Sequence, residues 1–182
     1  MKIVVVGVGY VGLVSGVCLS DFGHSVICVD KSLDKIKTLK LGKTSIYEPG
    51  LQPLMERNTK AGRLSFSSNL DKAVKDAEAI FISVGTPGRR GDGQADLTYI
   101  YEVAGELATI LNQYAVIITK STVPVGTNQK VKNIFREINP ALKVDIVSNP
   151  EFLREGSAID DMLNPHLVVI GANYKKTKNT IN

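Results

Sequence analysis

Short apolar runs recur along the chain, and each is followed by glycine, proline or small polar residues. The runs are rich in valine and isoleucine and are too short for helices. They have the composition of strands that are covered on both faces of a parallel sheet. They occupy residues 3–6, 25–30, 79–84, 115–119, 144–148 and 167–171, and a briefer run lies at 64–66.

The segments between these runs have the apolar spacing of helices. Asp21, Phe22 and Gly23 are expected to close the first helix, Ser32 to cap the second, and Asn69 or Asp71 to cap a short one. Helices are predicted from residue 12 to about 21, at 33–41, from 51, after 69 or 71, at 97–111 and 129–138, with a short amphipathic turn at 158–163.

The first run ends in Gly7-Val-Gly-Tyr-Val-Gly12. Gly7 permits a tight turn, Gly9 lets the backbone approach a diphosphate, and Gly12 lets the next helix pack closely on the strand. The free N–H groups of that helix and its dipole then face the anion. Because glycine turns of this kind are common, the motif alone is weak evidence for a nucleotide site.

Two further features support the nucleotide site. A helix is predicted to begin at Gly12, and Asp30 follows Gly12 by 18 residues at the end of the second run. This is close to the spacing at which a carboxylate accepts hydrogen bonds from both hydroxyls of an adenine ribose. The acid disfavours a 2′-phosphate and so favours NAD over NADP, although Lys31 and Lys35 lie nearby. The unit predicts an α/β fold that is Rossmann-like and doubly wound, with a mostly parallel sheet and helices on both faces.

Polar turns at the ends of later runs are expected to line the ligand cleft, because ligands of doubly wound sheets bind at the carboxyl ends of the strands. Thr86 follows the run at 79–84 and is expected to contact the cofactor. A threonine of 120–127 is placed to hold a water or a nicotinamide edge, whereas Thr127 is explained by a helix N-cap. The loop at 88–96, with Arg89, Arg90 and Asp92, is expected to be a surface loop.

The turn after the run at 144–148 carries two carboxylates four residues apart, Glu151 and Glu155, with Arg154 between them. Surface acids are common, so the charges alone decide little. Their position after a proline, on the same rim as Gly9 and Thr86, favours a functional site.

Composition adds limits to this picture. The 182 residues are 43% hydrophobic and 22% charged, which suits one soluble domain. The net charge is +4, but Lys175, Lys176 and Lys178 lie in a polar tail at 172–182 without acids, so residues 1–171 carry +1. We therefore expect no nucleic-acid surface, and no apolar run is long enough to cross a membrane. Cys18 and Cys28 are expected in the core, no metal site is expected, and a cytoplasmic location is predicted.

Five separated stretches together resemble one family. They are Gly-Val-Gly-Tyr-Val-Gly-Leu (7–13), Tyr-Glu-Pro-Gly-Leu (47–51), Val-Gly-Thr-Pro (84–87) with Asp-Gly-Gln-Ala-Asp-Leu (92–97), Lys-Ser-Thr-Val-Pro-Val-Gly-Thr (120–127) and Asn-Pro-Glu-Phe-Leu-Arg-Glu-Gly-Ser-Ala-Ile (149–159). The set resembles the N-terminal half of the UDP-glucose 6-dehydrogenases and their GDP-mannose relatives, over nearly the whole chain.

The resemblance implies two successive NAD-dependent oxidations at C6 of a nucleotide sugar, which convert UDP-glucose to UDP-glucuronate. Thr122 and Glu151 would order a water for proton removal and for hydrolysis of the acyl intermediate. The implied cofactor contacts, with those of the glycine turn, are Gly7, Val8, Gly9, Tyr10, Val11, Gly12, Asp30, Lys35, Thr86, Thr122 and Glu155. The implied substrate contacts are Tyr10, Glu151, Phe152, Leu153, Arg154 and Glu155.

Departures from the family's pattern are also informative. The family captures the aldehyde with a cysteine in a Gly-Phe-Gly-Gly-x-Cys-Phe-x-Lys-Asp stretch, and a Lys and an Asn on a long central helix hold the oxyanion. Nothing in this sequence matches that stretch, and Cys18 and Cys28 lie on the wrong elements. We therefore expect an NAD-binding domain at 1–171 without the central helix and C-terminal domain, inactive alone. Pro165-His166-Leu167 replaces the usual Pro-Asp-Arg and puts one local contact in doubt.

Alternatives stay open at this point. GDP-mannose is the other candidate substrate, and Gly156 weakly favours UDP-glucose. A non-catalytic NAD-binding module is the alternative from a different class. A separate second-half chain is a possible partner, and a homodimer is possible although the family dimerises through the central helix.

Overall fold

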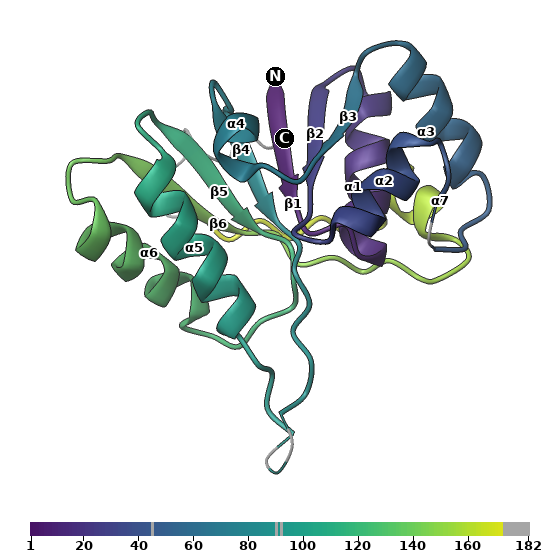
Figure 1. Cartoon of the computed structure of the whole chain (residues 1–182). Helices are drawn as coiled ribbons and strands as arrows, with labels where there is room; N and C mark the ends of the chain where they lie inside the picture. The colour runs from purple at the N-terminus through teal and green to yellow at the C-terminus, as the bar shows by residue number, and fades with distance from the viewer. Residues whose placement is uncertain (45, 90, 92, 173–182) are drawn as a thin grey trace.

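The computed structural model describes residues 1–44, 46–89, 91 and 93–172. Within these residues a six-stranded sheet carries helices on both faces (Figure 1). The strands are β1 (Lys2–Val6), β2 (Ser25–Val29), β3 (Leu64–Ser67), β4 (Ala79–Ile82), β5 (Ala115–Thr119) and β6 (Val144–Ser148). The helices are α1 (Tyr10–Asp21), α2 (Leu33–Lys40), α3 (Leu51–Lys60), α4 (Leu70–Val74), α5 (Thr98–Ile110), α6 (Thr127–Ile138) and α7 (Ala158–Leu163). The predicted tail beyond residue 172, with Arg90 and Asp92, lies outside the described residues.

The sheet has the strand order β3-β2-β1-β4-β5-β6, and every neighbouring pair is parallel. This confirms the predicted doubly wound fold, with a sheet that is wholly rather than mostly parallel in the described part. The chain runs outward from β1 in one direction and then from β4 in the other. The switch point between β1 and β4 is where such sheets leave a crevice for a ligand.

Alternation along the strands divides the core into two layers. Ile3 and Val5 of β1 pack in the layer with α1, α2, α3 and α7, whereas Val4 and Val6 pack in the layer with α4, α5 and α6. Figure 1 shows α1 and α3 on one side of the sheet and α5 and α6 on the other. Because both faces are covered, the strands are continuously apolar.

Cys18 and Cys28 lie in the first of these layers and are fully buried, as expected. Burial raises the pKa of each thiol to about 12. Both side chains therefore act as small apolar groups of the core.

Several helix ends agree with the sequence, and two do not. Ser32 caps α2, and Asn69 rather than Asp71 caps α4, where its side chain accepts a hydrogen bond of 2.8 Å from the Lys72 amide. Helix α1 begins at Tyr10, because Gly9 already has the extended backbone of an N-cap. Thr127 does not cap α6. Gly126 is the N-cap, and the Thr127 hydroxyl donates to the Pro124 carbonyl instead.

The strand predicted at 167–171 is wrong. Only Gly171 pairs with the sheet, in one antiparallel bridge with Ser148. Leu167 and Val168 are 63% and 56% exposed. The run meets β6 only at its last residue, and the Asn149 side chain, not a neighbouring strand, donates to the Val169 carbonyl. Apolar composition therefore does not suffice for a strand here: β6 is an edge strand, but the run pairs with it only at Gly171.

No helix in the described part is both long and apolar enough to cross a membrane. Helix α5, with 13 residues, falls short of the roughly 20 that a bilayer core requires. The same residues contain no group of three or more His, Cys, Asp or Glu side chains that could hold a metal ion.

Candidate functional site

The glycine turn connects β1 to α1 and is shaped by close backbone contacts. Gly7 has φ +97°, and its amide donates to the Val29 carbonyl at 2.8 Å. A Cβ on Gly12 would lie 1.9 Å from the Gly7 carbonyl oxygen, whereas a Cβ on Gly9 would have no heavy atom within 4 Å. Gly7 and Gly12 are thus required by the fold itself, and Gly9 leaves open space beside the backbone.

The start of α1 is suited to an anion. Gly9 is the N-cap of α1 and offers no side chain to the first amides of the helix. The first turn of α1 contains no acidic residue. The first amides of a helix have no intrahelical partner, and the helix dipole adds partial positive charge there. A diphosphate that lies against Gly9 therefore fits this turn.

Asp30 lies beside the glycine turn at the end of β2. Its Oδ2 accepts a hydrogen bond from the Val8 amide, and its Oδ1 accepts one from the Ser32 amide, both at 2.9 Å. A carboxylate offers about four acceptor positions, so each oxygen retains capacity for another donor. The acid is thus placed to accept two hydroxyls next to the turn.

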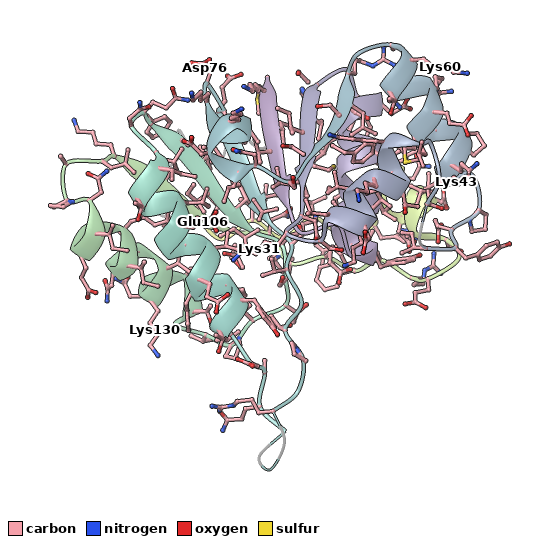
Figure 2. The ribbon with its side chains drawn as sticks, in the orientation of Figure 1. Lys31, Lys43, Lys60, Asp76, Glu106 and Lys130 are labelled. Carbon is pink, nitrogen blue, oxygen red and sulfur yellow. The ribbon has the colours of Figure 1, made fainter. Side chains whose placement is uncertain are left out.

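The two lysines near Asp30 point in different directions. Lys35 Nζ lies 3.8 Å from Asp30 Oδ2. Lys31 Nζ lies 3.7 Å from Glu106 Oε2 of α5, and Figure 2 shows the labelled side chains of Lys31 and Glu106 close together. Each lysine therefore faces a carboxylate, and no lysine pair is formed that would favour a 2′-phosphate.

The turns that follow β4, β5 and β6 lie side by side along the same edge of the sheet. The Ser121 hydroxyl donates to the Val84 carbonyl at 2.8 Å, and the backbone N–H of Asn149 donates to the Thr119 carbonyl at 3.0 Å. Thr86 is half-buried and Thr122 is exposed in neighbouring turns. The structure therefore joins the turns that carry the two predicted threonines, and the residue that begins the 149–171 segment bonds to the end of β5.

A cavity of about 850 Å³ lies between the sheet and the 149–168 segment. Ile3, Phe81 and Ile118 contribute apolar side chains from the strands. Glu151, Phe152, Leu153 and Arg154 line the cavity, so it includes most of the predicted substrate residues but neither Tyr10 nor Glu155. Its volume is in the range of small-molecule sites, which is about 300–1,000 Å³.

The structure gives the three charged residues of this turn different partners. Arg154 pairs with Asp161 of α7, with Nη2 2.6 Å from Oδ1. Glu151 Oε2 accepts from the Leu153 amide at 2.6 Å. Glu155 is exposed, and its negative charge helps to raise the pKa of the Tyr10 hydroxyl.

Lys120 was missed in the sequence, although it follows a buried strand directly. It is 6% exposed and lines the cavity, and its Nζ donates to Asn149 Oδ1 at 3.0 Å. Burial lowers the pKa of the Lys120 ammonium, and the charge of Glu151 opposes that shift. A buried cation thus stands near the Glu151 carboxylate.

Glu48 was also missed, although it belongs to a quoted motif at 47–51. It is 7% exposed, and its Oε2 accepts hydrogen bonds from the Tyr10 hydroxyl and the Gly156 amide. Burial by itself raises the pKa of Glu48, but the hydrogen bonds that it accepts outweigh this and hold the pKa below its ordinary value. Burial and the bond to Glu48 raise the pKa of Tyr10 to about 12.

The sequence model of the UDP-glucose/GDP-mannose dehydrogenase family, NAD binding domain, matches residues 1–182. The chain is 57% identical to the UDP-glucose 6-dehydrogenase of Rhizobium meliloti (strain 1021) over 171 residues, which are 94% of this chain and 39% of that protein. It is 46% identical to the UDP-glucose 6-dehydrogenase YwqF of Bacillus subtilis (strain 168) over 182 residues, which are 100% of this chain and 41% of that protein. The chain thus spans about two fifths of the length of these relatives.

Solved structures show the same relationship. A UDP-glucose dehydrogenase from Pyrobaculum islandicum superposes with a TM-score of 0.93 at 38% identity, over 98% of this chain and 42% of that chain. A ternary complex of a GDP-mannose dehydrogenase from Pseudomonas aeruginosa superposes with a TM-score of 0.95, also at 38% identity, over 100% and 43%. The similarity covers one part of each relative.

Proposed function

Because the chain belongs to the UDP-glucose/GDP-mannose dehydrogenase family and matches its NAD binding domain, we propose that it is the cofactor-binding part of a UDP-glucose 6-dehydrogenase. The proposed reaction oxidises C6 of UDP-glucose to the carboxylate of UDP-glucuronate in two steps. The observation that carries the proposed cofactor site is the Asp30 carboxylate beside the glycine turn, with Val8 N 2.9 Å from Asp30 Oδ2. The names of the relatives at 57% and 46% identity support UDP-glucose.

NAD, when bound, accepts the hydride. The chain's own residues would hold it, with the diphosphate on the amides of Gly9 to Gly12 and the adenine ribose on Asp30 and Lys35. Thr86, Thr122 and Glu155 would complete the site. This assignment is supported by the open space at Gly9 and by the remaining acceptor capacity of the Asp30 carboxylate.

Proton removal is assigned to Glu151 and Thr122, which would order a water next to the C6 hydroxyl. The hydroxyl can become a carbonyl only if its proton leaves as well. The hydrogen bond from the Leu153 amide fixes one oxygen of Glu151, and the charge of Glu151 opposes the burial that lowers the pKa of the Lys120 ammonium. The segment from Glu151 to Glu155, with Tyr10, would contact the nucleotide sugar.

GDP-mannose is the second candidate substrate, because the GDP-mannose dehydrogenase structure superposes with a TM-score of 0.95. The solved UDP-glucose dehydrogenase from Pyrobaculum islandicum has the same identity to this chain, 38%, so the two solved structures do not separate the substrates. The 57% identity to the UDP-glucose 6-dehydrogenase of Rhizobium meliloti favours UDP-glucose. The dissociation constants of UDP-glucose and GDP-mannose, each measured in the presence of NADH, would decide between the two substrates.

We further propose that these 182 residues bind NAD without completing the second oxidation. Cys18 and Cys28 are both fully buried with pKa values of about 12, so neither is suited to capture an aldehyde. The 182 residues contain no Gly-Phe-Gly-Gly-x-Cys stretch. We therefore propose that another polypeptide segment supplies the cysteine nucleophile that captures the aldehyde.

The experiment has two arms. Fluorescence titration of the chain with NADH and NADPH should show saturable binding that is stronger for NADH, and the absence of binding would refute the cofactor assignment. Incubation with UDP-glucose and NAD should yield no sustained NADH production. Sustained production by the chain alone would refute the proposal that it lacks the second step.

A further inference from the structure

Glu48 connects three parts of the chain that are far apart in sequence. It lies in the connection between α2 and α3. Its Oε2 accepts from the Tyr10 hydroxyl at the start of α1 and from the Gly156 amide at 2.8 Å, across 108 positions. Its Oε1 accepts from the Ala158 amide at 2.9 Å and from the Ile159 amide at 3.4 Å. One buried carboxylate therefore joins the beginnings of α1 and α7.

These hydrogen bonds determine the position of the carboxylate from both sides. A buried carboxylate is costly unless its oxygens are hydrogen-bonded, and here donors reach both of them. Helix α7 has no side-chain hydrogen bond from its own N-cap, Ser157. Glu48 instead satisfies the Ala158 and Ile159 amides in the first turn. The start of α7 thus depends on a side chain from another segment.

Tyr10 links this carboxylate to the glycine turn. It is the residue after Gly9 and the first residue of α1, so its backbone belongs to the proposed diphosphate site. Its hydroxyl donates to Glu48 and accepts from the Gly156 amide at 3.2 Å. A continuous series of contacts therefore runs from Gly9 through Tyr10 and Glu48 to the residues that follow Glu155.

We propose that Glu48 is a positioning residue that couples cofactor binding at the glycine turn to the 151–159 segment. The inference rests on the proposed function and assigns a role to a residue outside the proposed contacts. A ligand that restrains the backbone of Tyr10 also restrains its hydroxyl, and Glu48 passes that restraint to Gly156 and Ala158. Because such coupling is reciprocal, a sugar nucleotide that orders 151–155 would strengthen NADH binding by the same factor.

Amide hydrogen exchange of the 182-residue chain, with and without saturating NADH, tests the coupling. In the wild-type chain, NADH should slow exchange at Gly156, Ala158 and Ile159. In Glu48→Gln the side-chain NH₂ group would face backbone N–H donors and cannot accept their hydrogen bonds. Without NADH, the backbone amides of Gly156, Ala158 and Ile159 should therefore exchange at least about tenfold faster. Glu137→Gln changes an exposed glutamate of α6 and should leave them unchanged.

Tyr10→Phe provides the readout that a purely structural role would not affect. It leaves the bonds from Glu48 to the three amides in place but removes the hydroxyl that connects them to the turn. NADH should still bind, because the proposed diphosphate contact of Tyr10 is its backbone amide, which phenylalanine keeps. The effect of NADH on exchange at 156–159 should be lost. Tyr47→Phe, at a tyrosine that is 87% exposed, is the matched control and should keep the NADH effect.

The outcomes separate this inference from the proposed function. If wild-type chain does not bind NADH, the proposed function fails. If it binds NADH but exchange at 156–159 does not respond, or if Tyr10→Phe and Glu48→Gln retain the wild-type response, the coupling role of Glu48 is overturned.

Discussion

The glycine turn and the 149–171 segment lie at the same edge of the sheet but are held in different ways. The turn is held by backbone: the Gly7 amide bonds to Val29, and the backbone at Gly7 leaves no room for a Cβ on Gly12. The 149–171 segment is held to the rest of the chain largely by side chains, among them Glu48, which accepts from its amides, and Lys120, which donates to Asn149. Within the segment, Arg154 pairs with Asp161. Phe152 in this segment is 59% exposed, whereas Gly7 and Val8 are buried.

This difference indicates separate tasks. A backbone cradle keeps one shape, which suits the diphosphate common to all dinucleotides. A segment with few buried contacts opens more easily and can be repositioned by a small number of side chains. The cofactor site is therefore expected to be preformed, and the proposed sugar-contacting segment to depend on its attachments.

The largest effect is expected from Gly12→Ala. The new Cβ would lie 1.9 Å from the Gly7 carbonyl oxygen, so the turn and α1 cannot keep their positions. The variant should lose about 3 kcal/mol or more of unfolding free energy, at the upper end of overpacking costs. Urea unfolding followed by circular dichroism measures this loss. A stability within about 0.5 kcal/mol of wild type would contradict the backbone account of the turn.

Gly9→Ala should separate binding from folding. No heavy atom lies within 4 Å of its new Cβ, and Gly9 has φ −70°, so the fold should persist with a cost of at most about 1 kcal/mol at this N-cap. The methyl group would stand where a diphosphate approaches the backbone, so NADH affinity should fall at least about tenfold, or ~1.4 kcal/mol. Undiminished NADH affinity in a fluorescence titration would place the diphosphate elsewhere.

Asp30→Asn tests the acid at the other side of the cradle. Two backbone amides, Val8 and Ser32, donate to this carboxylate, and an asparagine must direct its NH₂ toward one of them. Unfolding free energy should fall by about 1–3 kcal/mol, and the preference for NADH over NADPH should shrink. Asp34→Asn, at an exposed position of α2, is the control. An unchanged NADH preference would remove Asp30 from the ribose site.

Acid should weaken the attachment of the 149–171 segment through Glu48. The folded-state pKa of Glu48 is lowered below the value of about 4.3 that holds when unfolded. Its stabilisation is therefore complete above the unfolded pKa and is lost as the pH falls through the lower folded value. The difference in unfolding free energy between wild type and Glu48→Gln should shrink from pH 6 toward pH 3. A difference that does not change with pH would contradict an ionised Glu48 in the fold.

The smallest effect is expected from Arg154→Ala. The Arg154 side chain is 70% exposed, whereas that of Asp161 is 12% exposed, and ion pairs with an exposed partner contribute little to stability. The thermal midpoint should change within experimental error, while the affinity for a nucleotide sugar in the presence of NADH should fall, because Arg154 belongs to the proposed sugar-contacting segment. A large loss of thermal stability would contradict this assignment and show that the ion pair is needed for the internal fold of the segment.

The same contrast explains what could be predicted from the sequence. The β1 strand, the glycine turn and Asp30 are encoded by neighbouring residues with strong local preferences, and their arrangement was predicted correctly as part of the fold. The strand at 167–171 was predicted wrongly because apolar composition does not reveal whether a run pairs along a neighbouring strand, and this one meets the edge strand β6 only at Gly171. Glu48 was missed because its partners lie far away in the sequence, Tyr10 at 38 positions and the three amides at 108 to 111, and no local pattern indicates such a pairing. The roles of Thr122, Glu151 and the other proposed contacts stay predictions.

Amide chemical shifts of the ¹⁵N-labelled chain during titration with NADH test the central claim most directly. The account predicts saturable shifts that are largest at Gly9, Tyr10 and Val11, with a second group at Asp30 to Ser32. Shifts concentrated instead around Ile3, Phe81 and Ile118 in the cavity, with the glycine turn unaffected, would contradict it.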